Sequence, residues 1–304
     1  MPPTLYTLEN EHWQVGILPE TGGSTAFGRV RVGDRFEDVM RPTAEADYGN
    51  ASLCASFIML PWANRLRDAK FSFEGVEYVL EASSADGTAI HGTVRKLPWR
   101  VVSADALHVR LMFDSSLYEK LNYPFEFSAE AEYRLEGGDF VMTLALRNED
   151  TRAIPAGFGH HPYFLRAPGG DANAVQLEIP CDQQYTLHNA LATAPPQPIS
   201  AASDYRTLKP LDDAQHDDLL TARHADKPMR MVYPAWGVEL AFHADALFEH
   251  VLLFAPVGKP FFALEPQTNA NDGFNLRAQG IAPAGVFVLQ PGESRRGECR
   301  LQVV

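Results

Sequence analysis

The sequence predicts an all-β protein, built as a large antiparallel sandwich with few short helices. Three observations indicate this fold class: many short segments alternate apolar and polar residues, turn-forming residues separate them, and helical periodicity is weak throughout. The 22 glycines and 22 prolines are spread along the chain, so they punctuate short elements instead of forming a linker. We expect residues 1–304 to form a single domain, because all-β sandwiches of this size often do.

The first third of the chain contains several strand signals. Residues 13–32 are expected to form short strands. Residues 71–73 and 76–80 flank a Glu-Gly turn, which predicts a hairpin. Residues 100–102 and 106–113 form a second strand pair around a short turn.

The strongest hairpin signal lies in the middle of the chain. From Phe125 to Leu135 every second residue is apolar and the residues between are polar or charged. Gly137-Gly138 then turns the chain, and apolar residues alternate again from Phe140 to Leu146. A period of two with one apolar face predicts a half-buried antiparallel hairpin.

The second half of the chain continues the β pattern. Short helices can form only near residues 43–47 and 214–222, and residues 192–210, which contain four prolines, predict a long ordered loop. Further strand-like runs cover residues 175–179, 238–242, 251–254, 261–265, 286–290 and 299–304.

The composition restricts the classes of partner. The chain is 45% hydrophobic, enough to bury a large core, and its formal net charge is −13. An acidic surface repels phosphate backbones and anionic lipids, so we expect neither nucleic acid nor a membrane surface as a partner. No apolar stretch approaches the roughly 20 residues that a membrane span needs. A small molecule is the better candidate.

The cysteines and the N-terminal residues indicate a cytoplasmic protein. Cys54, Cys181 and Cys299 are odd in number and far apart, so neither a disulfide framework nor a zinc motif emerges. The chain does not start with a basic region followed by an apolar run, so we expect no secretory signal. The sequence leaves a monomer and a homodimer open.

The most conspicuous candidate for chemistry is the adjacent pair His160-His161. It stands between Gly157-Phe158-Gly159 and Pro162-Tyr163-Phe164. Proline restricts the backbone of the residue before it, which is His161. Histidine is the side chain that gives and takes a proton most readily near neutral pH.

Other motifs carry further polar side chains that suit a binding or catalytic site. Glu265 ends an apolar strand that Pro266 terminates, and burial there would raise the pKa of the carboxyl toward that of a useful general base. The remaining motifs are Trp62-Ala63-Asn64-Arg65, His91-Gly92, His216-Asp217-Asp218 and Trp236-Gly237.

Four of these strings occur in an order that resembles the aldose 1-epimerase (galactose mutarotase) family over the whole chain. They are Ala63-Asn64-Arg65, His91-Gly92, His161-Pro162-Tyr163-Phe164 and Leu264-Glu265-Pro266-Gln267. The resemblance implies a β-supersandwich that binds a hexose in a cleft on one sheet, and a reaction without metal or organic cofactor. The galactose-specific branch usually has asparagine where His160 stands, so the His-Pro-Tyr-Phe form is closer to less specialised bacterial branches. Those branches include enzymes for hexose 6-phosphates and other charged sugars.

The reaction itself requires one base and one acid. Opening the hemiacetal means taking the proton of the C1 hydroxyl while protonating the ring oxygen, and closure on the other face reverses both roles. By the resemblance, Glu265 is the base and His161 is the acid. His91 matches the second active-site histidine, and His160 is expected to be structural.

The resemblance also assigns residues that bind the sugar. Arg65 and the neighbouring Asn64 would hydrogen-bond sugar hydroxyls, and Gln267 would be a further ligand or a support for one. Asp217 is the best match to the sugar-binding aspartate, with Asp212, Asp213 and Asp218 as rivals.

Aromatic and basic residues beside the motifs complete the candidate set. Tyr163, Trp236 and Trp62 could stack on a sugar face, although core packing explains each of them equally well. Arg95 and Arg166 each follow a motif closely and could meet an anionic group, or could be solvated surface residues.

Three alternatives remain open from the sequence. The chain could be a 1-epimerase of a hexose 6-phosphate or another charged sugar instead of a neutral hexose. It could be a non-catalytic carbohydrate-binding or sensor protein on the same fold. His91, His161 and Glu265 could also form a metal site, since two histidines and a carboxylate suit zinc or iron.

Overall fold

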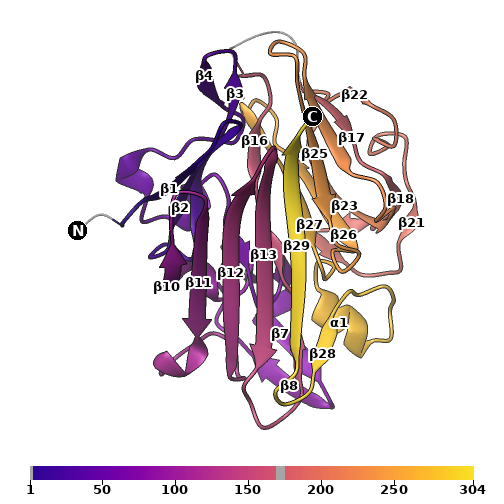
Figure 1. Cartoon of the computed structure of the whole chain (residues 1–304). Helices are drawn as coiled ribbons and strands as arrows, with labels where there is room; N and C mark the ends of the chain where they lie inside the picture. Colours follow the sequence, from indigo (N-terminus) through magenta and orange to yellow (C-terminus); the bar gives the residue numbers. More distant parts are fainter. Residues whose placement is uncertain (1–2, 169–174) are drawn as a thin grey trace.

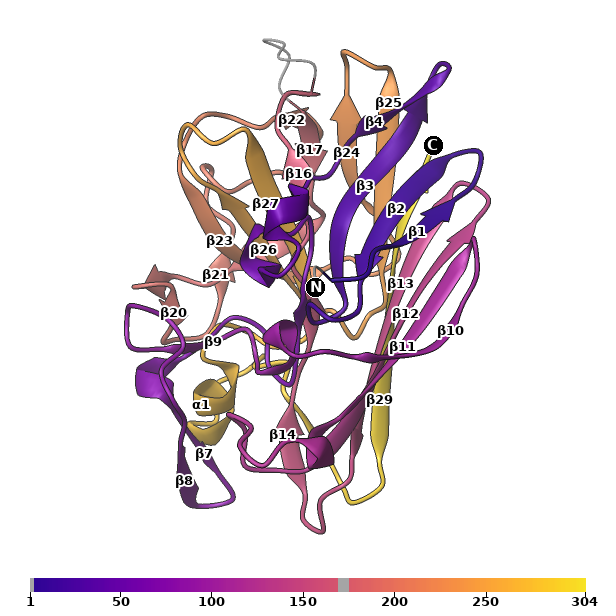
Figure 2. The same ribbon diagram turned by 90° about the vertical axis from the view of Figure 1, so that its left-hand side faces the viewer.

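Two large antiparallel sheets face each other across one core, which confirms the predicted fold class. The computed structural model describes residues 3–168 and 175–304 (Figure 1). In the side view of Figure 2, β11, β12, β13 and β29 form one layer, and β23, β26 and β27 form the other. Among the described residues no helix is long and apolar enough to cross a membrane.

The larger sheet has nine strands and contains the predicted central hairpin. Its β12 and β13 pair without interruption from Phe127 opposite Asn148 to Glu136 opposite Asp139. In spatial order the strands are β10 (Arg100–Ala104), β11 (His108–Asp114), β12 (Phe127–Glu136), β13 (Asp139–Asn148), β29 (Ser294–Val303), β25 (Val238–Ala244), β24 (Met229–Tyr233), β17 (Gln176–Glu178) and β22 (Lys209–Pro210).

The second sheet has eight strands. The path runs through β21 (Gln197–Pro198), β18 (Cys181–Gln184), β23 (His216–Arg223), β26 (His250–Ala255), β27 (Phe261–Gln267), β15 (Gly159–His160) and β5 (Ile58–Met59), and β16 (Tyr163–Leu165) pairs with β27. Strands from the start, middle and end of the chain therefore become neighbours in it.

Smaller sheets and one helix surround these layers. The strands are β1 (Tyr6–Glu9), β2 (Trp13–Leu18), β3 (Ser24–Val32) and β4 (Arg35–Asp38) in one sheet, and the pairs β6 (Arg65–Leu66) with β9 (Ala89–Ile90), β7 (Lys70–Phe73) with β8 (Val76–Val79), β14 (Ile154–Ala156) with β28 (Phe287–Leu289), and β19 (Leu187–His188) with β20 (Leu191–Ala192). The helix is α1 (Gly273–Ala278), and five 3₁₀ turns cover Glu45–Asp47, Ala51–Leu53, Arg67–Ala69, Val94–Lys96 and Ser115–Leu117.

The helices in the structure differ from those expected from the sequence. The helix expected near 214–222 is wrong, because His216–Arg223 is β23, hydrogen-bonded between β18 and β26. The helix expected near 43–47 is a single 3₁₀ turn, Glu45–Asp47. The sequence did not predict α1, which is only six residues long.

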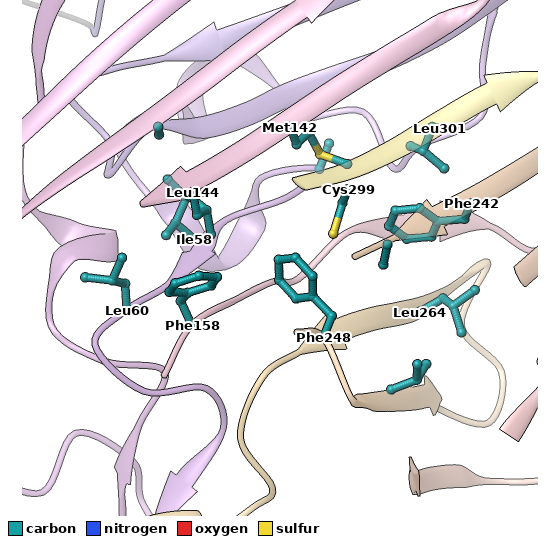
Figure 3. Packing of buried hydrophobic residues seen from close by; sticks show 14 of the residues in the cluster. Ile58, Leu60, Met142, Leu144, Phe158, Phe242, Phe248, Leu264, Cys299 and Leu301 are labelled. Carbon is teal, nitrogen blue, oxygen red and sulfur yellow. The ribbon is translucent and has the colours of Figure 1, made fainter. Parts of the chain in front are cut away.

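The core lies between the two large sheets. Figure 3 shows Met142 and Leu144 of β13 and Cys299 and Leu301 of β29 above Phe158, Phe248 and Leu264. All of these side chains are fully buried, and the rings of Phe158 and Phe248 meet edge to face, with centroids 5.7 Å apart. Leu264 therefore points into the core, and its neighbour Glu265 points to the opposite face of β27.

Candidate active site

Glu265 lies in the middle of the second sheet, on the face turned away from the core. It pairs with Leu252 of β26, and Gln267 pairs with His250. Paired residues of antiparallel strands share a face, so Glu265 and Gln267 lie next to each other on it. Neither residue is exposed to solvent.

The two adjacent histidines point to opposite sides of β15. His160 pairs with Ile58, which belongs to the core, and burial lowers the pKa of His160 to about 3. His161 continues on the other side, where its backbone N–H donates to the carbonyl of Phe57 at 3.0 Å. This alternation is why only His161 reaches the face that carries Glu265.

Glu265 and His161 are in contact. Nε2 of His161 lies 3.1 Å from Oε1 of Glu265, and their side chains are 7% and 0% exposed respectively. Apart from this contact, the two carboxylate oxygens of Glu265 and Nδ1 of His161 have no polar partner within the described chain. Buried polar atoms without partners are costly, so this pair is arranged for something other than stability.

Burial shifts the two pKa values in opposite directions. It raises the pKa of Glu265 well above its usual value, and the nearby Asp217 carboxylate raises it further while Arg65 opposes the change. Burial lowers the pKa of His161 well below its usual value, and the guanidinium groups of Arg41 and Arg95 lower it too. Both side chains are thereby pushed toward their neutral forms.

His91 joins this pair from the N-terminal part of the chain. Its ring meets that of His161 edge to face, with centroids 5.1 Å apart. Its backbone adopts a left-handed φ of 60°, and its N–H donates to the carbonyl of Asn64 at 2.8 Å. Burial lowers its pKa, and its Nδ1 has no partner among the residues the structure describes.

The glycine after His91 has a specific role. Gly92 has a φ of 68°, and a Cβ there would lie 1.9 Å from the carbonyl oxygen of Leu60. Only glycine lets the chain pass this close to the Leu60 backbone. The His91-Gly92 motif is therefore explained by packing as well as by chemistry.

Asn64 and Arg65 lie beside His91, because β6 and β9 pair Arg65 with Ile90. Arg65 donates from Nε to Asp86 at 2.9 Å, and its side chain is 23% exposed. Asn64 has a φ of 57° and accepts the N–H of Arg65 at 2.9 Å, so its amide orients the arginine backbone.

Asn269, which sequence reasoning missed, ties this segment to the strand that carries Glu265. Its Oδ1 accepts the N–H of Ala63 at 2.9 Å, and its Nδ2 donates to the Ala63 carbonyl at 3.0 Å. Asn269 is fully buried, two residues after Gln267. An asparagine two residues beyond a motif forms no distinctive pattern. Its closeness to Glu265 in the sequence was the one signal that could have indicated it.

Among the four rival aspartates, Asp217 is the one that shares the face of Glu265. It pairs with Phe254 of β26, and burial raises its pKa while Arg65 lowers it. Asp212 and Asp218 instead hold the His216 ring at 2.9 and 2.7 Å. The fourth, Asp213, is fully exposed at its side chain.

The remaining expected residues separate into two groups. Tyr163 and Gln267 lie with the cluster: the Tyr163 ring is 4.5 Å from the His161 ring, and Gln267 Oε1 is buried without a partner within the described chain. Trp236 lies in the turn between β24 and β25 of the other sheet, with its ring 6.0 Å from that of Tyr233.

The arginines near the motifs lie in different parts of the structure. Arg95 is 9% exposed, and its guanidinium carbon lies 5.3 Å from the centre of the Phe57 ring, which contacts His161. Arg166 donates instead to the carbonyl of Asp212 at 2.6 Å, in another part of the sheet. Arg41, absent from every sequence motif, lies 3.8 Å above the Tyr163 ring.

The metal alternative finds no support in the geometry. Across residues 3–168 and 175–304, no group of three or more His, Cys, Asp or Glu side chains is arranged to hold a metal ion. His91, His161 and Glu265 are close together but do not form such a group.

Comparison with known proteins gives one family over nearly the whole length. A family model described as aldose 1-epimerase matches residues 4–302. YphB of Escherichia coli K12, itself uncharacterized, is 23% identical, and the alignment covers 99% of each chain. YihR of the same organism, also uncharacterized, is 23% identical over 79% of this chain and 76% of its own.

Solved structures share the fold at low sequence identity. A galactose mutarotase-like protein from Clostridium acetobutylicum superposes with a TM-score of 0.85 at 17% identity, covering 98% of this chain and 94% of its own. Galactose 1-epimerase from Lactobacillus acidophilus NCFM superposes with a TM-score of 0.77 at 17% identity, covering 98% and 93%.

Proposed function

Because the chain belongs to the aldose 1-epimerase family, we propose that it interconverts the α and β anomers of a hexose by general acid–base catalysis. The observation that carries the proposal is the contact between His161 and Glu265, 3.1 Å apart, whose buried polar atoms lack other partners among the described residues. A sugar hydroxyl and a ring oxygen would supply those partners.

The proposed reaction needs one proton on each side of the anomeric bond. Glu265 takes the proton of the C1 hydroxyl, the C1–O1 bond becomes a carbonyl, the C1–O5 bond breaks, and His161 gives its proton to O5. The open aldehyde rotates about C1–C2. O5 then attacks the other face of C1, His161 takes back the O5 proton, and Glu265 returns a proton to O1.

The pair holds one proton throughout this cycle. It starts with ionised Glu265 and protonated His161, and in the open-chain state it has neutral Glu265 and neutral His161. Burial favours the second state, and the short distance between the two side chains favours the first through their attraction. Because these effects oppose each other, they reduce the energy difference between the two states, which suits a reversible reaction.

The surrounding polar residues would hold the sugar in place. We assign His91 to the ring-oxygen side beside His161, where its neutral ring can donate or accept one hydrogen bond. Arg65, Asn64 and Asp217 would bind hydroxyls on the side of Glu265, and Tyr163 would cover one sugar face.

We further propose that the reaction uses no cofactor and takes place in the cytoplasm. Both proton-transfer groups come from the chain itself, so the chemistry is complete without a metal or an organic group. Cys54, Cys181 and Cys299 are all free and buried, as is usual in a reducing compartment.

Glu265→Gln and His161→Asn test the proposal. Each change removes one proton-transfer group and leaves a polar side chain in its place, so kcat should fall by about 10²–10⁴-fold. The measurement is polarimetry of freshly dissolved α-glucose and α-galactose. His188→Asn, at an exposed position, is the matched control and should match the wild type.

Two results would contradict the proposal. If both variants keep the wild-type rate, the pair does not transfer the protons. If the wild type binds sugars saturably without accelerating mutarotation, the alternative of a non-catalytic carbohydrate-binding protein is correct instead.

A further inference from the structure

A cluster of three charged side chains lies behind the proposed sugar-binding aspartate. His216 and Asp218 flank Asp217 in β23, and successive side chains of a strand point to opposite faces. Asp217 shares the face of Glu265, so His216 and Asp218 lie on the face turned toward the core between the sheets. With Asp212 they form what we call the His216 cluster, which the proposed reaction does not use.

His216 holds a carboxylate on each of its two ring nitrogens. Its Nδ1 lies 2.7 Å from Asp218, its Nε2 lies 2.9 Å from Asp212, and its side chain is 3% exposed. A neutral imidazole carries a proton on one nitrogen only, and an ionised carboxylate can only accept a hydrogen bond. The imidazolium is therefore the form that satisfies both contacts, because it donates to each carboxylate.

The other polar groups around the ring are compatible with this charge. The hydroxyl of Tyr205 lies 3.4 Å from Nε2 of His216, and the two rings meet edge to face with centroids 5.7 Å apart. Nζ of Lys209 lies 4.2 Å from the centre of the Tyr205 ring, and Arg166 donates to the carbonyl of Asp212 at 2.6 Å.

The two carboxylates also favour the charged form of the histidine energetically. The hydrogen bond to Asp218 raises the pKa of His216, burial lowers it, and the hydrogen bond to Asp212 raises it, with a net increase. His216 thus differs from His160, His161 and His91, whose pKa values burial lowers.

The His216 cluster joins the two large sheets at their edges. Asp212 lies just beyond β22, the edge strand of the nine-stranded sheet, and Leu211 before it donates from its backbone N–H to the carbonyl of Val175 at 2.9 Å. His216 and Asp218 belong to β23 of the second sheet. The cluster therefore fixes the start of β23 against the opposite layer.

The part of β23 that carries Asp217 is paired on one side only. β26 pairs with β23 from His216 to Leu220. On the other side, β18 pairs with β23 between Leu220 and Arg223, and no strand among the described residues continues this pairing to His216. The His216 cluster holds this end of the strand where a second neighbouring strand is missing.

The cluster also sets the charge beside Asp217. Burial raises the pKa of Asp217, Arg65 lowers it, and the adjacent Asp218 carboxylate raises it. An imidazolium in contact with Asp218 offsets that last effect, because the opposite charges partly cancel at Asp217. Asp217 is then kept ionised, and an ionised carboxylate accepts the strongest hydrogen bonds from sugar hydroxyls.

We infer that His216 is a positioning residue, which holds Asp217 in place and ionised for sugar binding through its contacts with Asp212 and Asp218. The inference rests on the proposed function, in which Asp217 binds a sugar hydroxyl. His216 itself contacts neither the sugar nor the reacting atoms. Its removal should therefore change sugar affinity, only through Asp217, and leave proton transfer by Glu265 and His161 nearly unchanged.

A double-mutant cycle in the full-length protein tests whether His216 acts through Asp217. Asp217→Asn weakens a charge-assisted hydrogen bond and should raise KM for galactose or glucose by about 10–100-fold. His216→Gln should raise KM by about 3–30-fold, a part of that effect, and change kcat by less than about threefold. In the Asp217→Asn background, His216→Gln should change KM no further.

His224→Gln is the matched control. His224 follows the opposite end of β23 and also contacts one carboxylate, that of Asp182 at 2.8 Å, so its KM should match the wild type. Asp212→Asn breaks the cluster at a side chain that is 52% exposed, and it should raise KM in the same direction as His216→Gln. This variant carries the test if urea unfolding shows that His216→Gln does not fold.

Nuclear magnetic resonance of the ¹⁵N-labelled wild type reads the charge directly. Both ring nitrogens of His216 should carry a proton near neutral pH, with signals that His216→Gln or Asp212→Asn identifies. A spectrum in which one of these nitrogens is unprotonated would overturn the inference.

The kinetic outcomes separate this inference from the proposed function. If the two changes raise KM independently, or if His216→Gln lowers stability and leaves KM unchanged, the inference is wrong and the epimerase proposal stands. If the wild type accelerates no mutarotation, the proposed function fails. Dissociation constants for galactose from calorimetry then complete the same cycle, and the inference fails too if the effects multiply or if no sugar binds.

Discussion

Glu265 and His161 illustrate how burial prepares two ordinary side chains for proton transfer. Each is charged near neutral pH only at an electrostatic cost, and the two are in contact at 3.1 Å. Since the pair titrates as one unit, its pKa values belong to the pair and not to either residue.

The pH profile of kcat/KM should therefore show a broad plateau. The active pair holds one proton and is neutral overall. Burial disfavours adding a second proton, which would leave a net positive charge, and also disfavours losing the last one, which would leave a negative charge. Burial lowers the pKa of His161, which moves the low-pH limb down, and raises the pKa of Glu265, which moves the high-pH limb up, so the plateau should be wider than solvated, independent groups would give.

Stopped-flow polarimetry across the pH range in which the protein stays folded would measure this profile. A narrow optimum confined between pH 4.5 and 6.5 would mean that the two groups titrate as if they were solvated and independent.

The strand β27 organises the site through simple alternation. Leu264 faces the core and Glu265 faces the candidate site, so a strand that stabilises the sandwich also carries the proposed base. The segment after β27 also supports the site, because the Asn269 side chain forms hydrogen bonds with both the N–H and the carbonyl of Ala63. The loop with Asn64 and Arg65 is in this way held at a fixed distance from Glu265.

Asn269→Ala should loosen that loop. The Ala63 N–H and carbonyl would both lose their partner, so the free energy of unfolding should fall by about 1–3 kcal/mol. Because Asn269 positions the residues proposed to bind the sugar and is not one of the proposed proton-transfer groups, KM should rise severalfold while kcat changes less. Urea unfolding and polarimetry measure the two effects.

Asn275→Ala is the matched control for this change. Asn275 also donates from its side chain to a backbone carbonyl, that of Lys70, but it lies on α1 outside the cluster. If Asn269→Ala lowers stability and leaves KM at the wild-type value, Asn269 is a structural residue only.

The fold of the whole molecule brings residues that are far apart in the sequence together at the site. The site takes His91 from the first third, His161 from the middle and Glu265 from the last part. Both large sheets contribute side chains to the core beneath it, as Figure 3 shows. We therefore expect the two sheets and the site to unfold together in one cooperative transition.

Phe158→Ala tests this dependence on the shared core. Phe158 is fully buried, it packs against Phe248 and Phe287, and it directly precedes β15. Removing its ring leaves a cavity between the sheets, so the free energy of unfolding should fall by about 3–5 kcal/mol in urea titrations. Leu117→Ala, at a position 77% exposed, should change it by less than about 0.5 kcal/mol.

A Phe158→Ala variant as stable as the wild type would mean that the sheets do not share one close-packed core at this point.

Features that depend on neighbouring residues could be predicted from the sequence, and features that depend on contacts between distant residues could not. The central hairpin was predictable because its alternation and its glycine turn are local. The segment 214–222 was not predictable. A short run of apolar and polar residues suits a helix or a strand, and here the hydrogen bonds to β18 and β26 make it a strand. Trp236 and Arg166 looked equivalent to Tyr163 and Arg95 along the chain, and only sheet order separates them.

By itself the sequence determined the fold class, the family resemblance and the two residues that we assign to proton transfer, because each depends on residue type and on spacing within short strings. The tertiary structure alone decided that Glu265 meets His161, that Asn269 holds Ala63, and that Arg41 joins Arg95 near the site. Those contacts join residues far apart in the chain. They depend on the pairing register of strands that alternate side chains across two faces, and no local pattern encodes that register.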